Sequence, residues 1–324
     1  MIRPADYLAF LRREYLADFI RAGGAAVKFV VPFEGAALAD LEEGLARAAR
    51  EQGYVVARVD AREVKLHLAD RLFFEVARQV PWDELARAVV LQALAELRFQ
   101  LPPAGEPLSV EALAEANRYN AQELRRDLSR RLQQRILGDY LLSQEFRTAM
   151  LRLCQAQVDT GAAAQHDRSA VLEWLRGELR LLSSLKPAGI FQRVGRHNAR
   201  HLLLSLAHWL PLAGRSGLLL DLDIARYAVA RRGAAGEGLY YSKAAAMDAY
   251  EVLRQLIDAT DELSHCFVLV ACAPEFLTDD ARGLDAYHAL KLRIWDEVHD
   301  QRRANPLSAL IRLSPAAEPW SHAA

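Results

Sequence analysis

Cysteine is scarce in this chain, with only three among 324 residues. Cys154, Cys266 and Cys272 have neither the spacing of a metal site nor that of a disulfide framework. The scarcity excludes a small secreted scaffold held by disulfides and favours a reducing compartment. Reduced thiols in the core are therefore expected.

Long apolar runs are also missing, and none approaches the roughly 20 residues of a membrane-spanning helix. The opening M-I-R-P-A-D-Y lacks the apolar core of a signal peptide. No charge of one sign dominates, because the formal net charge is -1, so only local patches can indicate a nucleic-acid partner. With 52% hydrophobic and 26% charged residues, we expect a globular, soluble, cytoplasmic protein without membrane contact.

A strand–turn–helix–strand pattern organises the N-terminal part of the chain. The apolar run 27–31 predicts a strand, the amphipathic stretch 38–50 predicts a helix, and 54–59 predicts a second strand. Two strands joined through a helix imply a parallel sheet with a right-handed crossover.

The turn after the first strand lies where a P-loop NTPase carries G-x-x-x-x-G-K-[ST]. When the motif is aligned with this turn, Pro32 and Ala37 occupy the positions of the two glycines, Leu38 that of the lysine and Ala39 that of the hydroxyl residue. Only Gly35 in the turn is a glycine. A phosphate loop needs the lysine for the phosphates and the hydroxyl for Mg²⁺, so tight triphosphate binding is not expected. From this stretch alone, an ordinary βα turn without a ligand is the alternative interpretation.

A second apolar run, L-L-L-D-L-D at 218–223, ends in acid as a Walker B strand does. Such a strand supplies an aspartate for Mg²⁺ and usually a glutamate that orients the attacking water. If Asp223 is the metal ligand, Ile224 occupies the next position, and if Asp221 is the ligand, Leu222 does. Neither assignment leaves an acid to act as the general base.

The middle of the chain is expected to be helical. A long helix over 121–151 carries an arginine row interleaved with acids, which favours a solvated face over a phosphate site. The row consists of Arg125, Arg126, Arg130, Arg131 and Arg135.

A basic cluster follows at F-Q-R-V-G-R-H-N-A-R-H, residues 191–201. Arg193, Arg196 and His197 are candidates for contacts with phosphate or a partner, and structural hydrogen bonding is the alternative. His197 and His201 are four residues apart and would share a helix face. No third ligand stands at a recognised spacing, so no metal site is expected.

Three segments together resemble the P-loop ATP-binding proteins of bacterial BREX-type phage-defence systems and their relatives. They are Y-L-A-D-F-I-R-A-G-G-A-A-V-K-F-V-V, G-R-S-G-L-L-L-D-L-D and A-C-A-P-E-F-L-T-D-D-A-R-G-L-D-A-Y-H-A-L-K-L-R. The resemblance spans both ends of the chain, and its P-E-F-L turn is the most specific part. It implies an AAA+-like ATPase fold that works beside helicases, nucleases or methyltransferases.

The chain departs from this family pattern at four places. The phosphate lysine is Leu38, the Mg²⁺ hydroxyl is Ala39, the Walker B glutamate is Ile224, and the polar sensor is Ala273. The resemblance leaves Gly35 and Asp223 as a vestigial nucleotide pocket and Arg293 as a candidate interface arginine.

The fold class expected is α/β, a P-loop NTPase or AAA+-like three-layer sandwich with a mainly parallel sheet and a large helical insertion. The expected parts are an N-terminal helix (1–22), the first part of the α/β core (23–68), the helical insertion (69–186), the second part of the core (187–314) and a tail (315–324).

The function expected is that of a pseudo-ATPase, a scaffolding or assembly subunit of a prokaryotic anti-phage defence complex. Its partners would be other subunits, such as a helicase, a nuclease or an active ATPase, in a homo- or hetero-oligomer. No catalytic residue and no cofactor is expected, beyond weak binding of ATP and Mg²⁺. Two alternatives stay open: a divergent ATPase holding phosphate with Lys28, Arg193 or Arg196, and a nucleic-acid-binding module, in which DNA contacts the arginine row or the basic cluster.

Overall fold

The computed structural model describes residues 1–33, 38–103, 105–229, 238–295 and 305–315. The chain forms two compact units, one from Met1–Gln79 with Arg215–Ala324 and the other from Val80–Gly214. Each unit has its own core and is described by itself.

The first unit is built on a five-stranded sheet in the order β2-β3-β4-β1-β5, with every neighbouring pair parallel. The strands are β1 (Ala25–Pro32), β2 (Val55–Asp60), β3 (Leu218–Asp223), β4 (Cys266–Ala271) and β5 (Leu310–Leu313). Strand β4 is apolar throughout and β3 is apolar except for Asp221 and Asp223, as expected for strands covered by helices on both faces.

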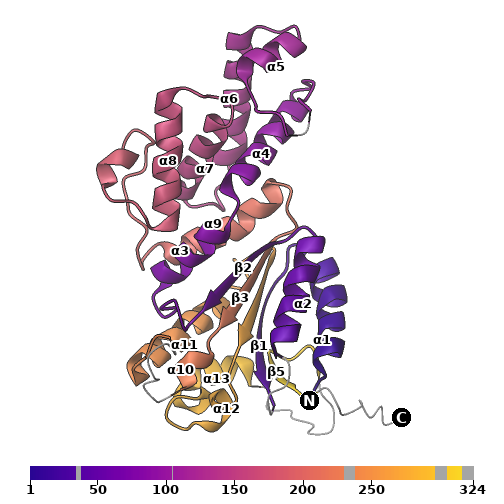
Figure 1. The fold of residues 1–324 in the computed structure, drawn as a ribbon, viewed down its shortest axis with the longest axis vertical. Helices are drawn as coiled ribbons and strands as arrows, with labels where there is room; N and C mark the ends of the chain where they lie inside the picture. Colours follow the sequence, from indigo (N-terminus) through magenta and orange to yellow (C-terminus); the bar gives the residue numbers. More distant parts are fainter. Residues whose placement is uncertain (34–37, 104, 230–237, 296–304, 316–324) are drawn as a thin grey trace. The chain divides into compact units, whose positions relative to one another are not determined.

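One face of the sheet is covered by α1 (Pro4–Phe10), its π-helical continuation η1 (Leu11–Phe19) and α2 (Leu38–Glu51). Figure 1 shows α1 and α2 on this face and α10 and α11 on the opposite one. The Tyr15 ring meets Phe267 of β4 edge-on at 5.4 Å between centroids. Tyr7, Leu11, Leu41 and Leu45, buried in the same layer, complete the apolar cluster over the sheet.

The opposite face carries α11 and short C-terminal helices. They are α10 (Ala225–Ala228), α11 (Lys243–Asp258), α12 (Glu275–Thr278), η3 (Leu284–Ala286) and α13 (His288–Ile294). Phe29 of β1 stacks on Phe276 at 6.0 Å, and Tyr250 meets Phe276 edge-on at 5.6 Å. The predicted α/β fold with a parallel sheet between two helical layers is confirmed.

Helix α3 (Ala69–Gln79) packs on β2, the edge strand. The Gln79 side chain accepts the Arg58 N–H at 2.9 Å and donates to the Arg58 carbonyl at 2.7 Å. It satisfies backbone groups that an edge strand leaves open. Helix α3 therefore belongs to the α/β unit, although the expected helical insertion begins at residue 69.

The second unit is helical. It contains α4 (Trp82–Glu96), α5 (Val110–Ala116), α6 (Ala121–Leu137), α7 (Gln144–Ala156), α8 (Ala162–Arg176), η2 (Leu182–Leu185) and α9 (Ala199–Leu212). The buried rings of Trp82 and Trp209 meet Phe146 edge-on at 6.2 and 6.4 Å. Because α9 joins this core, residues 187–214 lie in the helical unit, whereas the sequence interpretation placed them in the α/β core.

The predicted single helix over 121–151 is wrong, because two helices stand there. Helix α6 ends at Leu137, and α7 begins after Ser143, whose hydroxyl accepts the Phe146 N–H at 3.4 Å. Between them Asp139 accepts the Leu141 N–H at 3.1 Å, which gives the backbone a turn in place of helix.

Candidate functional site

The carboxyl ends of β1, β3 and β4 meet at one edge of the sheet. The order places β4 between β1 and β3, and the Val30 carbonyl of β1 accepts the Cys272 N–H at 2.9 Å. From β1 the chain moves toward β2, while from β4 it crosses to β5 on the other side. Ligands of open α/β sheets bind outside the carboxyl ends at such a reversal, so this edge is the candidate site.

The β1 end of the site is apolar where it is described. Gly35 and its neighbours 34–37 lie outside the described residues. Leu38, at the first position of α2, packs against the apolar cluster over the sheet, and Ala39 is exposed. The residue that aligns with the phosphate lysine thus contributes to packing and brings no charge.

Asp223 ends β3 beside Asp60 of β2 on one side and Ala271 of β4 on the other. Its Oδ1 accepts the Ala225 N–H at 2.9 Å, which fixes the turn into α10. Burial raises the pKa of its carboxyl above the ordinary range. Ile224, in the position of the Walker B glutamate, is 2% exposed and fills core space.

A buried ion-pair cluster lies on the same face of β3, two residues before Asp223. The carboxyl groups of Glu42 in α2 and Asp221 are 5% and 3% exposed. Arg58 Nη2 donates to Glu42 Oε2 at 2.9 Å, and Arg58 Nε lies 3.5 Å from Asp221 Oδ2. Burial and then the charge of Glu42 raise the pKa of Asp221 to about 7, against the lowering effect of Arg58.

Glu42, Asp60, Asp221 and Asp223 form what we call the acidic cluster. Their mutual charge is part of the reason that the pKa values of Glu42, Asp221 and Asp223 are raised. Arg58 is the cation that pairs with two of these four groups, Glu42 and Asp221, so the cluster holds more acidic groups than basic ones. The described part of this edge therefore offers a triphosphate no excess of positive charge, and sequence reasoning missed the contributions of Glu42 and Arg58. Among the described residues no group of three or more His, Cys, Asp or Glu is placed to hold a metal ion.

Lys28, the alternative phosphate ligand in this unit, lies inside β1 and is 4% exposed. Its Nζ donates to the carbonyls of Leu307 and Ser308, the latter at 3.0 Å, and stands 4.9 Å above the Tyr15 ring. Burial lowers the pKa of this ammonium to about 8. Lys28 therefore anchors the segment that enters β5.

Substitution of Lys28 by methionine tests this structural role. We expect a loss of about 1–3 kcal/mol in the free energy of unfolding, because two carbonyls lose their charged donor. Urea denaturation measures the change, and Lys65→Met, at an exposed lysine, serves as the control with a shift within about 0.5 kcal/mol. An unchanged stability with altered nucleotide affinity would point instead to phosphate binding.

Arg293 in α13 is held inside its own chain. Its Nε and Nη2 donate to the two carboxylate oxygens of Asp258 at 2.5 and 3.1 Å, and its Nη1 donates to the Ala289 carbonyl at 2.9 Å. This bidentate pair joins α13 to α11. Contact with a neighbouring subunit would first require this pair to open.

The other three candidates, Arg193, Arg196 and His197, lie in the helical unit. All are exposed, and Arg193 donates to the carbonyls of Leu179 at 3.3 Å and Arg180 at 2.7 Å. The prediction that His197 and His201 share a helix face is wrong, because α9 begins at Ala199.

The arginine row of α6 is largely engaged within the helical unit. Arg131 and Arg135 both pair with Glu96 of α4, at 2.6 and 2.8 Å, and Arg125 pairs with Glu111 at 3.4 Å. The sequence predicted a solvated face interleaved with acids, and the structure adds that three of the five arginines pair with acids of α4 and α5.

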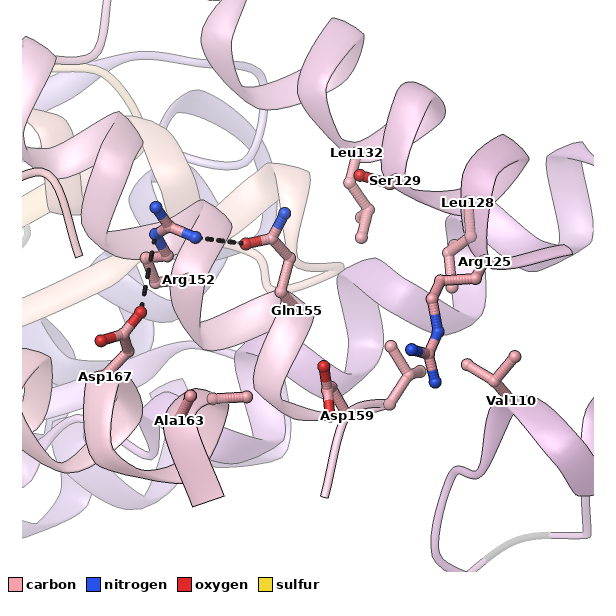
Figure 2. Close-up of a pocket in the computed structure, with 12 residues that line it drawn as sticks. Val110, Arg125, Leu128, Ser129, Leu132, Arg152, Gln155, Asp159, Ala163 and Asp167 are labelled. Carbon is pink, nitrogen blue, oxygen red and sulfur yellow. Dashed lines mark hydrogen bonds and ion pairs between the residues drawn. The ribbon is translucent and has the colours of Figure 1, made fainter. Parts of the chain in front are cut away.

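The helical unit has a hollow of about 350 Å³ lined mainly by residues of α6, α7 and α8. Figure 2 shows the side chains that line it. Leu128, Leu132 and Val158 give it an apolar floor, and Arg152 lies at its rim. The Arg152 guanidinium already donates to Gln155 at 3.3 Å and to the Ala188 carbonyl at 3.1 Å, and it lies 4.0 Å from Asp167. Because its two arginines, Arg125 and Arg152, already have partners in the chain and Asp159 and Asp167 also line it, this hollow is poorly suited to a phosphate group.

Comparison of the chain with models of known protein families identifies one family that matches it. The model of the BREX system ATP-binding protein BrxC/D matches residues 13–319. Neither a curated protein nor a solved structure matches the chain. No helix in the described part of the chain is long and apolar enough to cross a membrane. The family match covers both compact units, and the chain belongs to the BREX system ATP-binding protein BrxC/D family.

Proposed function

We propose that this chain is a pseudo-ATPase, a subunit of a BREX-type defence complex that keeps the ATP-binding fold without catalysing hydrolysis. The observation that carries the proposal is the acidic cluster at the edge where the phosphates would lie. Apolar residues stand at the positions of the phosphate lysine and the general base, namely Leu38 and Ile224.

The role proposed is scaffolding and assembly in the cytoplasm. In the described residues the sheet packs against an apolar helical layer, and this α/β unit would supply the surface on which other subunits dock. Its partners would be other subunits of the defence system, among them a helicase, a nuclease or an active ATPase, in a homo- or hetero-oligomer. Arg293 contributes to the stability of the α11–α13 surface in this scheme.

The divergent ATPase is less well supported by the geometry. Lys28 donates to two backbone carbonyls, and Arg193 and Arg196 belong to the other compact unit. We propose that Gly35 and Asp223 belong to a vestigial nucleotide pocket that binds ATP and Mg²⁺ weakly or not at all.

Titration of the full chain with Mg-ATP tests the loss of nucleotide chemistry. We expect no binding in the micromolar range and no phosphate release, because the phosphate lysine is absent and the acidic cluster has more acidic groups than basic ones. Isothermal calorimetry and a phosphate-release assay measure both. Micromolar affinity together with turnover that Asp223→Ala abolishes would establish the divergent ATPase.

The scaffolding role is tested by co-expression with the neighbouring subunits and native mass spectrometry. The expected result is a complex that contains this chain without added nucleotide and whose mass is the same for Asp223→Asn. The same variant should protect cells from phage as well as the unaltered chain does. Assembly only with ATP, or loss of protection in the variant, would refute the role.

A further inference from the structure

A stretch without acidic residues gives the helical unit a local positive charge. Between Glu178 and Asp221 the chain has no aspartate or glutamate, although it contains 42 acidic residues in all. We call residues 179–201 the basic segment. It contains two histidines, His197 and His201, and five permanent cations. The cations are Arg180, Lys186, Arg193, Arg196 and Arg200.

The cations of the basic segment lie open to solvent, with Arg200 half-buried and the other four exposed. In the described ranges of the chain none of the five takes part in an ion pair, whereas three arginines of α6 pair with Glu96 or Glu111. Arg193 donates to the carbonyls of Leu179 and Arg180. These bonds join the start of the basic segment to its later part without neutralising the charge of Arg193. Arg180 shares a hollow with Glu173 and Glu178, which offset part of its charge, and the positive charge of Lys186, Arg193, Arg196 and Arg200 is available to an external anion.

The start of α9 adds to this positive charge. Arg200 and His201 lie in the first turn of a 14-residue helix that has no acidic residue there. The helix dipole places partial positive charge at this end, so cations are unfavourable in this turn and an anion is favourable. Asn198 does not cap the helix, since its Oδ1 accepts the Gly195 N–H at 2.8 Å. The cations of α9 and of the preceding loop thus reinforce one another.

Two large apolar side chains stand exposed among these cations. Phe191 and Leu181 are 66% and 68% exposed. The backbone beside Phe191 is fixed, because Trp174 Nε1 donates to the Gln192 carbonyl at 2.9 Å. An exposed aromatic ring on a fixed backbone beside exposed cations is the combination with which proteins hold unstacked bases.

We propose that the basic segment binds single-stranded nucleic acid, with its cations on the phosphates and Phe191 stacked on a base. A duplex offers the same phosphates but keeps its bases stacked inside, so it leaves Phe191 without a partner. This binding is independent of the loss of ATP chemistry, since every residue involved lies in the helical unit.

Fluorescence anisotropy of the full chain with a labelled oligothymidylate tests the proposal. Four exposed cations predict that the affinity falls with salt with a log–log slope of about -3. Arg180→Glu with Arg196→Glu should lower the affinity at least about tenfold at low salt. The matched control is Arg126→Glu with Arg130→Glu, which makes the same change in net charge on exposed positions of α6 and should lower the affinity less than about threefold.

Phe191→Ala separates stacking from charge. The expected result is an affinity about fivefold or more lower with an unchanged salt slope, and weaker binding of a duplex of equal length. Urea denaturation confirms that each variant is folded, as expected for exposed side chains. Equal losses in the two charge variants, a duplex bound as tightly as the single strand, an unaffected Phe191→Ala, or the absence of salt-dependent binding would each overturn the proposal.

Discussion

Replacing Arg58 by methionine is expected to lower the free energy of unfolding by about 3 kcal/mol at pH 8. Arg58 is the cation that both buried carboxyl groups contact, Glu42 at 2.9 Å and Asp221 at 3.5 Å. Removal of one partner from a buried ion pair costs about 3–5 kcal/mol, because the remaining charge stays unsolvated. The lower end applies here, since the Arg58 side chain is itself half exposed to solvent.

The loss should be smaller at pH 5.5 than at pH 8. The pKa of Asp221 is raised to about 7 in the folded chain, so this carboxyl retains a proton that the unfolded chain releases near pH 4. The resulting stability is fully present below about pH 4 and is lost as the pH rises to about 7. Without Arg58 the pKa of Asp221 should rise further, so the variant should go on losing stability above about pH 7, where the loss in the unaltered chain has ended.

Urea denaturation at both pH values measures this effect. Arg13→Met is the matched control, because the Arg13 side chain is 78% exposed and, among the described residues, pairs with its neighbour Glu14 alone. That variant should shift stability by less than about 1 kcal/mol at either pH. A loss below 1 kcal/mol for Arg58→Met at pH 8, or an equal loss at the two pH values, contradicts the buried ion-pair cluster.

Replacing Gly217 by alanine is expected to lower the free energy of unfolding by about 4 kcal/mol. Gly217 precedes β3 with φ of +145°, and a Cβ there would lie 2.1 Å from the His265 carbonyl oxygen. That carbonyl cannot move away, because it accepts the Leu218 N–H at 2.8 Å at the start of the β3–β4 ladder. The Gly217 carbonyl itself accepts the Val55 N–H of β2 at 2.9 Å.

Gly105→Ala is the control for this substitution. Gly105 also has a positive φ, +88°, but a Cβ there would meet no atom within 4 Å. Gly105→Ala should therefore lower the free energy of unfolding by about 1 kcal/mol, the cost of placing an alanine at a positive φ. Equal losses for the two variants, measured by urea denaturation, would show that the close contact with His265 is relieved at little cost.

The sequence by itself determined the class of fold. Buried parallel strands are short apolar runs between glycine-rich turns and amphipathic helices, and this pattern is local enough to read at β1, β3 and β4. Element boundaries were less accurate, as the break between α6 and α7 shows. There the apolar spacing of a helix continues through the break, and only short polar side chains such as the capping Ser143 mark it.

Only the tertiary structure decided what each charged residue does. Lys28 binds carbonyls nearly 280 positions away in the chain, Glu42 and Asp221 share Arg58, and Arg293 is paired with Asp258. These pairings depend on strand order and helix packing, which bring distant residues within 4 Å, and local spacing does not encode them. The electrostatic effect of a charged side chain falls off with distance and is screened by salt. Whether a cation is paired with an acid or open to solvent is therefore known only once the distances between side chains are known.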